Sequence, residues 1–230
     1  MPTAIVSGAS QGFGLAVTEA LAARNWSVVV DARHEEVLRA ATAHLPGVVA
    51  IGGDISDPEH AHALVAAAGR LGKQGGLDLL INNASHLGTI RPLADSSADD
   101  LSAAYAVNVH APLGLTRLAL PLLAAATQPA VVMMSSDAAT EAYAGWGVYG
   151  SSKAALDQLA AVLAAEHPRL RVYAFDPGDM RTAMHQQAFP GEDISDRPEP
   201  ASVVPALLRL IDGRAPSGRY RSCDLLAVAL

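Results

Sequence analysis

Aromatic residues make up only 4% of this 230-residue chain, and the chain contains a single cysteine, Cys223. A lone cysteine excludes an internal disulfide and is typical of proteins from a reducing compartment. Because Trp, Tyr and Phe are scarce, the core has to be built mainly from alanine, valine and leucine. We therefore expect a cytoplasmic protein with an aliphatic core.

The chain also lacks the features that membrane, nucleic-acid and metal partners require. No signal peptide precedes the first strand-like run, and the longest apolar stretches, such as residues 118–126, are too short to span a bilayer. The formal net charge of -7 argues against a nucleic acid or an anionic membrane as a partner. His60 and His62 are two residues apart in a helical pattern and cannot face one ligand, so we place both on the surface and expect no metal site.

Short apolar runs alternate with alanine-rich helical patterns along the whole chain. The strand-like runs are residues 4–7, 27–31, 48–51, 77–82, 130–134 and 171–175. The helical patterns are residues 12–24, 35–45, 58–69, 98–126 and 149–166. Runs that are apolar throughout and alternate with helices predict a parallel sheet covered by helices on both faces. No repeat or linker interrupts the alternation, so we expect one α/β domain over residues 1–230.

Some boundaries in this pattern carry local signals. Asn25 can adopt the left-handed conformation that ends a helix, and Asp57 followed by Pro58 is typical of a helix start. Residues 184–200 are polar, contain proline and show no periodicity, so we expect an irregular and functional loop there.

Three glycines, Gly8, Gly12 and Gly14, lie where the first strand turns into a helix. Glycines at this position let the backbone approach a ligand closely and direct amide groups at a phosphate. Their G-x-x-x-G-x-G spacing differs from the common dinucleotide-binding fingerprint. The turn therefore predicts a nucleotide site, with a tightly packed structural turn as the alternative.

The end of the second strand leaves the choice of cofactor open. An acidic residue there accepts hydrogen bonds from the adenosine ribose of NAD, whereas an arginine binds the 2′-phosphate of NADP. This chain has both, Asp31 and Arg33. A solvated ion pair between the two side chains is a third interpretation.

Polar or glycine-containing groups follow each of the later strands, at the sheet edge where open α/β sheets bind ligands. They are Asp54, the Asn82–Asn83–Ala84 segment, Ser135 and Ser136, the Asp176–Pro177–Gly178 segment, and Thr182. Each could be a local cap or turn, but their shared edge predicts one binding cleft.

Tyr149 and Lys153 are four residues apart at the start of a helical pattern, so their side chains share one face. A nearby ammonium favours the phenolate and lowers a tyrosine pKa, which suits proton exchange with a substrate oxygen. Ser136 follows a strand and can hold the same oxygen. The alternative is that Tyr149 only packs at a helix start.

Together, these residues and their spacing resemble the short-chain dehydrogenase/reductase family over nearly the whole chain. The resemblance implies a three-layer, Rossmann-type doubly wound sheet with strand order 3-2-1-4-5-6-7. It implies that Tyr149 is the acid/base, that Ser136 holds the substrate oxygen, and that Lys153 binds the nicotinamide ribose and lowers the Tyr149 pKa. It further implies that Asn108 positions a water in a proton relay.

The resemblance also implies a nicotinamide cofactor and its contacts. The cofactor residues would be Gly8, Ser10, Gln11, Gly12, Phe13, Gly14, Arg33, Asp54, Asn82, Ala84, Tyr149, Lys153, Pro177, Gly178 and Thr182. Members that prefer NADP carry an arginine where this chain has Arg33, and members that prefer NAD carry an acid where it has Ala32. Asp31 lies one position too early, so we expect NADP rather than NAD.

Two regions depart from the family pattern. The family usually ends in a glycine-rich strand, whereas here Ser217, Gly218, Arg219 and Tyr220 lead to Asp224 and an apolar tail over residues 225–230. The other departure is the loop over residues 184–200. Both leave the substrate unpredicted.

Four further side chains have open interpretations. Trp146 and Tyr143 lie between Ser136 and Tyr149 and either pack or line the pocket. Asp137 and Asp179 lie at a pocket rim or, in the interpretation we prefer, are simply solvated.

Pro112 has no N–H for the carbonyl of Asn108, so we predict a kink that holds a water there, unless the helix ends and restarts near residue 110.

The sequence therefore predicts an NADP-dependent oxidoreductase that interconverts a carbonyl and a secondary alcohol. A catalytically silent NADP-binding sensor on the same fold is the alternative. A sugar-nucleotide epimerase is disfavoured, because 230 residues leave no room for a second domain. The helical patterns over residues 113–126 and 154–165 are apolar on nearly all sides, which predicts a homodimer or homotetramer, with the apolar tail in a second interface.

Overall fold

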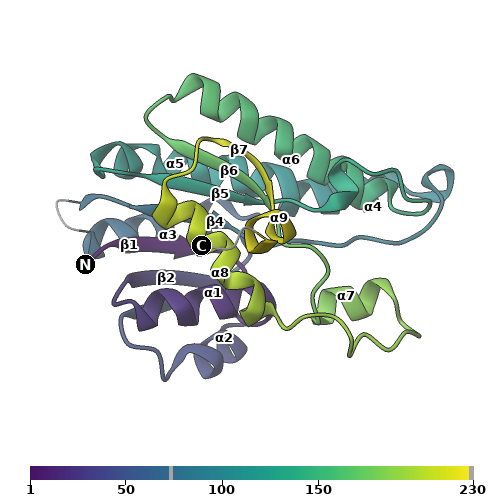
Figure 1. Ribbon diagram of the computed structural model, residues 1–230, viewed down its shortest axis with the longest axis horizontal. Helices are drawn as coiled ribbons and strands as arrows, with labels where there is room; N and C mark the ends of the chain where they lie inside the picture. The colour runs from purple at the N-terminus through teal and green to yellow at the C-terminus, as the bar shows by residue number, and fades with distance from the viewer. Residues whose placement is uncertain (73–74, 228–230) are drawn as a thin grey trace.

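Seven parallel strands form a single sheet in the order β3-β2-β1-β4-β5-β6-β7 (Figure 1). The computed structural model describes residues 1–72 and 75–227. The strands are β1 (Thr3–Val6), β2 (Ser27–Ala32), β3 (Val48–Gly52), β4 (Leu79–Asn82), β5 (Ala130–Met134), β6 (Arg171–Asp176) and β7 (Gly218–Arg221). The strand order that the family resemblance implies is confirmed.

Helices cover both faces of the sheet, so the molecule has three layers (Figure 1). One face carries α1 (Gly12–Ala23), α2 (Glu35–Thr42) and α8 (Pro200–Gly213). The other carries α3 (Pro58–Leu71), α5 (Ala111–Ala125) and α6 (Gly147–Glu166), with α4 (Ala98–Tyr105) leading into α5. Each face has its own core of aliphatic side chains, as the shortage of aromatic residues predicts.

The inner strands are buried on both sides, which explains why they appear in the sequence as continuous apolar runs. Every residue of β1, β4 and β5 is buried. The edge strand β7 is different, because its four residues include two arginines and none is fully buried. For that reason no apolar run marks β7 in the sequence.

Two helices near the C-terminus correct the expectations from sequence. No helix was predicted over α8, whose interior contains Pro205, yet Val203, Leu207 and Leu210 form a buried stripe along it. The region 184–200 is not irregular throughout, since α7 (Ala183–Ala188) occupies its start. The Thr182 side chain begins α7 by accepting a hydrogen bond from the amide of His185 at 3.1 Å.

The long helical pattern over residues 98–126 contains a π-helical turn, η3 (Ala106–His110), between α4 and α5. The amide of Ala111 bonds to the carbonyl of Ala106, five residues back, which is the mark of a π turn. The chain stays helical through residue 110, so the alternative of a helix that ends and restarts there is wrong. The water predicted at the Asn108 carbonyl stays a prediction.

The predicted local signals are confirmed. Asn25 has a φ of 60°, and the Asp57 side chain accepts a hydrogen bond from the amide of Glu59 at 2.9 Å. Across residues 1–72 and 75–227, no helix combines the length and apolar character needed to cross a bilayer. The predicted interface role of residues 225–230 falls partly outside the described residues, which end at 227.

Candidate active site

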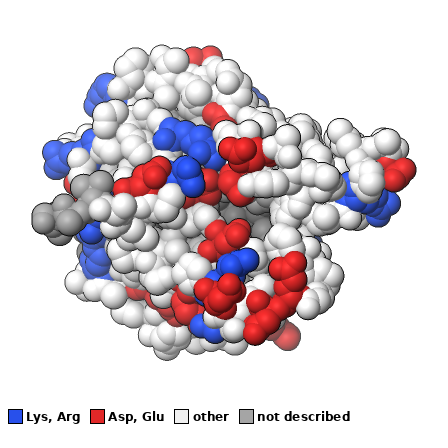
Figure 2. All heavy atoms as spheres, turned by 45° about the vertical axis from the view of Figure 1, so that its right-hand side comes forward, with Lys and Arg blue, Asp and Glu red and all other residues white. Residues whose placement is uncertain are grey.

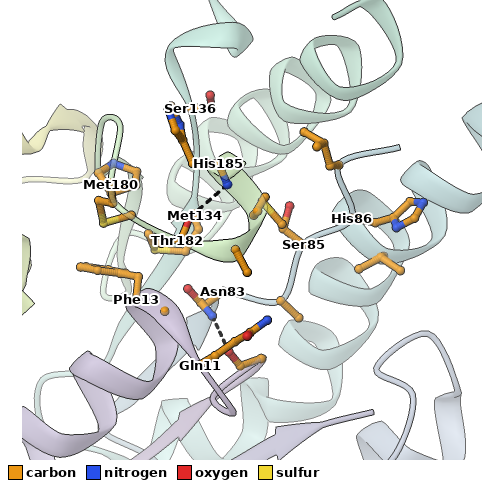
Figure 3. A pocket seen from close by; sticks show the side chains of 18 of the residues that line it. Gln11, Phe13, Asn83, Ser85, His86, Met134, Ser136, Met180, Thr182 and His185 are labelled. Atoms are coloured by element: carbon orange, nitrogen blue, oxygen red, sulfur yellow. Dashed lines mark hydrogen bonds between the residues drawn. The ribbon is translucent and has the colours of Figure 1, made fainter. Parts of the chain in front are cut away.

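A cleft of about 350 Å³ lies at the carboxyl ends of the strands, where the sequence places its polar residues. Of the predicted site residues, it is lined by Gly8, Ser10, Gln11, Gly12, Phe13, Arg33, Asp54, Ala84, Ser136, Tyr149, Lys153, Pro177, Gly178 and Thr182. Figure 3 shows Gln11 and Phe13 of the glycine-rich turn on one side and Ser136 on the other. Three predicted residues, Gly14, Asn82 and Asn108, lie behind the walls of this cleft.

The glycine-rich turn is built on close backbone contacts. Gly8 has a φ of 69°, and a Cβ atom on it would lie 2.8 Å from the Cα of Ala84. A Cβ atom on Gly14 would lie 2.4 Å from the carbonyl oxygen of Gly8, so Gly14 lets α1 pack directly against the turn. The Asn83 side chain donates hydrogen bonds to the carbonyls of Ser7 and Gly8 and ties the turn to the end of β4. The remaining surface of the turn faces the cleft.

Asp31 does not form the solvated pair with Arg33 that was one interpretation of the sequence. Its side chain is buried, accepts a hydrogen bond from the amide of Gly8 at 2.8 Å and lies 3.1 Å from His60 Nε2. His60 is also buried, because it contacts the buried carboxylate of Asp31. The prediction that His60 lies on the surface was therefore wrong. Arg33 is exposed and lines the cleft.

Asn82 is a buried structural residue. Its amide donates to Thr116 Oγ1 at 3.1 Å and to the sulfur of Met133 at 3.2 Å, which ties β4 to α5 and β5. The next two residues, Asn83 and Ala84, reach the cleft instead. Side chains alternate in direction along a strand, and the chain leaves β4 for a loop after Asn82, so the two residues that follow can face the cleft.

Ser136, Tyr149 and Lys153 converge on the cleft from two elements. Tyr149 and Lys153 lie on the first turns of α6, and Ser136 follows β5. The Lys153 ammonium donates to the carbonyl of Met134 at 2.7 Å and lies 5.4 Å from the centre of the Tyr149 ring. Ser136 Oγ donates to Asp137 Oδ1 at 3.0 Å.

The pKa of Tyr149 is raised above its ordinary value, whereas the sequence predicted that it would be lowered. Burial raises the pKa of Tyr149 to about 12, and hydrogen bonds with the side chains of Ser85 and Ser136 oppose part of this rise. Burial also lowers the pKa of Lys153 to about 8. The expectation considered only the attraction between ammonium and phenolate, whereas both side chains are almost fully enclosed and burial penalises both charged forms.

Asn108 lies in the π turn η3, behind the cleft, and is hydrogen-bonded on all sides. Its Oδ1 accepts from the amide of His86 at 2.7 Å and from Ser85 Oγ at 3.2 Å. Its Nδ2 donates to the carbonyl of His86 at 2.8 Å and to Ser152 Oγ at 2.9 Å. Asn108 thus joins the loop after β4 to α6, next to Tyr149.

The part of the cleft beside Tyr149 is mostly apolar. Leu87 and Ala138 are buried against Tyr149, and Trp146, Met184 and Ala188 pack around them. The Trp146 ring lies 5.9 Å from the Tyr149 ring in an edge-on arrangement, so Trp146 both packs and lines the cleft. Tyr143 does not line the cleft and donates to Asp137 at 2.9 Å.

Carboxylates lie at the rim of the same part of the cleft. Asp137 and Asp179 are exposed and line the opening, so the rim interpretation of these two residues holds. Figure 2 shows acidic side chains gathering around the middle of one face, with a few basic side chains among them. Among residues 1–72 and 75–227, no group of three or more His, Cys, Asp or Glu side chains could hold a metal ion.

Several residues of the cleft were not singled out from the sequence, among them the polar or flexible side chains of Ser85, His86, Met184 and His185. Ser85 and His86 directly follow the Asn82–Asn83–Ala84 segment, so extending that segment by two residues would have found them. Met184 and His185 lie on α7, which Figure 3 shows beside Thr182. They fall within the loop that was expected to be functional, but neither was singled out because the helix was not predicted.

The cleft fits a nicotinamide dinucleotide. Gly8, Gly12 and Gly178 have positive φ values of 69°, 60° and 72°, so backbone lines the cleft closely at the turns after β1 and β6. An exposed arginine lies at one end and the Tyr149–Lys153 pair at the other. Such a cradle holds phosphates at the helix N-terminus of the turn and leaves the other end for a reactive ring.

Comparisons with known proteins agree with this reading of the cleft. An uncharacterized oxidoreductase of Escherichia coli (strain K12), YciK, is 32% identical over 225 residues, covering 93% of this chain and 88% of the relative. Sepiapterin reductase of Mus musculus is 33% identical over 218 residues, covering 88% of this chain and 82% of that protein.

Solved structures are similar over the same extent. A short chain dehydrogenase from Shigella flexneri 2a str. 301, complexed with NADP, has a TM-score of 0.88 at 30% sequence identity and covers 96% of this chain and 97% of its own. One from Escherichia coli CFT073, complexed with NADPH, has the same score and identity and covers 96% of both chains. The family model described as short chain dehydrogenase matches residues 2–193. Because this match spans both the glycine-rich turn and the Tyr149–Lys153 helix, the chain belongs to the short-chain dehydrogenase/reductase family.

Proposed function

We propose that this protein is an NADP-dependent oxidoreductase that interconverts a carbonyl compound and a secondary alcohol, with Tyr149 as the general acid and base. The observation that carries the proposal is the convergence of Ser136, Tyr149 and Lys153 on one cleft whose other end is the glycine-rich turn. When bound, the nicotinamide would donate or accept the hydride. The protein has to orient the reactants and move one proton.

Contacts at the second strand support NADP as the cofactor. Asp31 is already engaged by the amide of Gly8 and by His60, so its carboxylate is not available to an adenosine ribose. Arg33 is exposed at the cleft, where its guanidinium can pair with a 2′-phosphate. Two structurally similar proteins are complexed with NADP or NADPH.

The proton step is assigned to Tyr149 from its burial and its neighbours. With a pKa raised to about 12, the Tyr149 hydroxyl is protonated at neutral pH and can donate to a carbonyl oxygen held by Ser136. The Lys153 ammonium lies beside the ring and stabilises the phenolate that forms. Asn108 fixes the Ser85–His86 loop behind Tyr149, which is where the family resemblance places a proton relay.

The walls around Tyr149 favour a particular class of substrate. Leu87, Trp146, Met184 and Ala188 provide an apolar surface. Asp137 and Asp179 are carboxylates at its rim, and the negative charge of Asp179 is partly balanced by Arg197 at 3.8 Å. A carbonyl compound with an apolar body and no carboxylate or phosphate fits this environment best. A positive charge remote from the carbonyl is favoured by the rim carboxylates.

The outward faces of α5 and α6 support assembly as a homodimer or homotetramer. Leu113 is 36% exposed and Val162 is 41% exposed, and most neighbouring outward positions are alanine or leucine. Two copies that pack these helices together across a two-fold axis would bury this surface. The single cysteine supports a reducing compartment, and we place the protein in the cytoplasm.

Turnover of a carbonyl panel tests the proposed function. The purified protein is mixed with NADPH and with aliphatic, aromatic and charged ketones and aldehydes, and loss of the reduced nicotinamide is followed by absorbance. Turnover of at least one carbonyl that disappears in Tyr149→Phe supports the proposal. Tight NADPH binding with no turnover of any compound would instead favour the silent sensor.

A further inference from the structure

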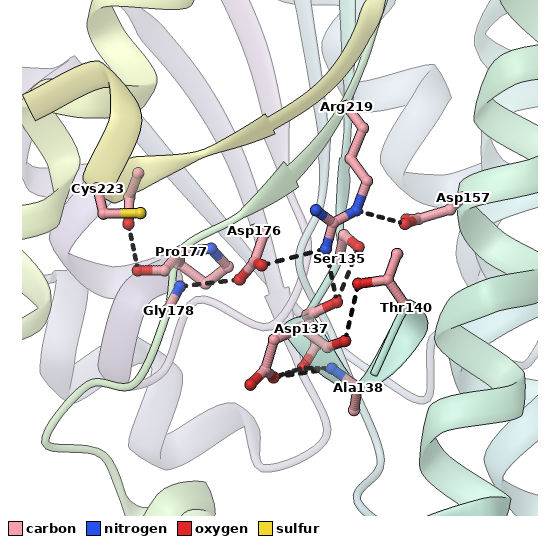
Figure 4. Close-up of polar contacts among 12 residues, drawn as sticks. Ser135, Asp137, Ala138, Thr140, Asp157, Asp176, Pro177, Gly178, Arg219 and Cys223 are labelled. Carbon is pink, nitrogen blue, oxygen red and sulfur yellow. Dashed lines mark hydrogen bonds and ion pairs between the residues drawn. The ribbon is translucent and has the colours of Figure 1, made fainter. Parts of the chain in front are cut away.

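The seventh strand contributes a side chain to the catalytic region, although β7 is the exposed edge of the sheet. The geometry points to Arg219 as a positioning residue that fixes the Ser136 loop and the Pro177–Gly178 turn relative to α6, and the inference rests on the proposed function. Figure 4 shows the Arg219 guanidinium between Asp157 and Asp176. These two carboxylates belong to the consecutive elements α6 and β6, and Arg219 lies 62 and 43 residues away from them in the sequence.

One guanidinium makes contacts with three elements. Arg219 Nε donates to Asp157 Oδ2 on α6 at 3.0 Å. Its Nη2 donates to the backbone carbonyl of Ser136 at 2.9 Å and to Asp176 Oδ2 at 3.1 Å. The planar fork of an arginine can serve partners in several fixed directions, which a lysine ammonium on a flexible stem does less well.

Each partner of Arg219 leads directly to a residue of the active site. Ser136 is itself the residue proposed to hold the substrate oxygen. Asp176 Oδ1 accepts from the amide of Gly178 at 3.0 Å, and this bond shapes the turn that lines the cleft. Asp157 is one helical turn after Lys153, and its charge raises the Lys153 pKa against the larger effect of burial.

Burial makes these contacts hard to replace by water. The side chains of Asp176, Asp157 and Arg219 are 4%, 16% and 27% exposed. Removing the guanidinium would leave a buried carboxylate at Asp176 without its cation, and its pKa, already raised by burial, would rise further. Ser222 directly follows β7 and adds a second contact to the Pro177–Gly178 turn, since its hydroxyl donates to the carbonyl of Pro177 at 2.7 Å.

The main test compares Arg219→Met with Arg221→Met, an exposed arginine two residues along the same strand. We expect Arg219→Met to lower kcat by about 10- to 100-fold, because small displacements of reacting groups cost about this much. NADPH affinity should fall by a smaller factor than kcat, because only the Pro177–Gly178 turn is loosened at the cofactor, whereas Arg33 and the glycine-rich turn are untouched. Arg219→Lys should be intermediate, and Arg221→Met should match the wild type.

A double variant separates positioning from simple loss of stability. Arg219→Met combined with Asp176→Asn removes the uncompensated buried charge, so thermal stability should recover. The carbonyl of Ser136 still lacks its donor in this double variant, so kcat should remain low. Recovery of kcat together with stability would overturn the inference and assign Arg219 a structural role only.

Hydrogen exchange provides a readout that does not depend on turnover. Exchange of the backbone amides in residues 136–139 and 176–178 should be faster in Arg219→Met than in Arg221→Met, measured by mass spectrometry on the protein with NADPH. Equal exchange in the two variants, or a kcat within about twofold of wild type in Arg219→Met, overturns the inference. If the wild type reduces no carbonyl at all, the proposed function fails, and the exchange measurement still decides whether Arg219 fixes the two loops.

Discussion

The two ends of the cleft are built in different ways. The cofactor end consists of the turn after β1 and the ends of β2 and β3, where backbone and a few side chains close together in the sequence form the surface. The substrate end combines Leu87, Trp146 and α7, and it is stabilised from behind by Arg219. Short-range motifs thus supply most of the surface of the first end, although Asn83 ties its turn to β4, and long-range packing determines the second.

The members of a family can share the construction of the cofactor end while they differ at the substrate end. A turn that presents backbone amides binds the phosphates of any dinucleotide, so it needs only glycines at fixed spacing. A surface that selects a substrate needs side chains from several elements, and these can change without disturbing the sheet. Mutations at the two ends should therefore have separable effects on cofactor binding and on chemistry.

The largest effect is expected from Tyr149→Phe, at the junction of the two ends. Loss of the proposed proton carrier should lower kcat by about 10²- to 10⁴-fold or more, because proton transfer in the transition state contributes about that much. Cofactor affinity should remain, since the glycine-rich turn and Lys153 are intact. Steady-state kinetics and NADPH titration measure these two effects. If the variant keeps most of its turnover, Tyr149 is not the general acid and base.

The next largest effect is expected from a substitution that changes cofactor affinity alone. Arg33→Ala should weaken NADPH binding by about 10- to 150-fold, since a charge-assisted contact contributes about 1.5–3 kcal/mol. NADH binding should hardly change. Fluorescence titration of both cofactors measures this, with Arg39→Ala on α2 as the control because Arg39 pairs with Glu35 and does not line the cleft. A preference for NADH that Arg33→Ala leaves unchanged would exclude the 2′-phosphate assignment.

Lys153 should make stability depend on pH. Its pKa falls from 10.5 in the unfolded chain to about 8 in the folded protein, so between these values the unfolded chain binds more protons and stability rises with pH. At about 1.4 kcal/mol per pH unit, the buried ammonium costs the fold about 3 kcal/mol at neutral pH. The Tyr149 pKa of about 12 acts in the opposite sense, and stability should fall again as the pH rises from 10 towards 12.

The variant that tests this is Lys153→Met. At pH 7 it should be more stable than wild type by about 2 kcal/mol, after about 1 kcal/mol is subtracted for the lost hydrogen bond to Met134. The advantage should shrink as the pH rises from 8 towards 10.5, because the unfolded lysine loses its proton over this range. Well above pH 10.5 the lysine is neutral in both states, and the variant should be less stable than wild type by the lost hydrogen bond. Urea unfolding across this range measures it, with Gln158→Met on the exposed side of α6 as a pH-independent control. No pH dependence in the difference would contradict the buried charge.

The smallest effect concerns substrate charge at the other end. With two ketones that differ only in carrying a remote ammonium or a remote carboxylate, the wild type should prefer the ammonium compound in kcat/KM. Asp179→Asn should reduce this preference by only about two- to fivefold, because the Asp179 side chain is 60% exposed and pairs with Arg197 at 3.8 Å, so its field is screened. The effect should shrink at high salt, and a preference for the carboxylate compound would count against the proposed substrate class.

Much of the fold and of the cofactor end could be predicted from the sequence. Strands buried on both faces are apolar throughout, so their order along the chain is visible, whereas β7 and α8 are marked by arginines and an internal proline and were not recognised as apolar elements. Gly8, Gly12, Ser136, Tyr149 and Lys153 all reach the cleft as expected. Their positions follow strand ends and helix turns, which are local properties of the chain.

The sequence by itself therefore determined most of the elements, the residues proposed for the chemistry and the sheet edge at which they meet, because these depend on short-range periodicity and turn formation. Only the tertiary structure decided the burial of His60 against Asp31, the raised pKa of Tyr149 and the reach of Arg219 to Ser136. Solvent exclusion and contacts between distant segments arise when the layers pack, and no spacing along the chain records them.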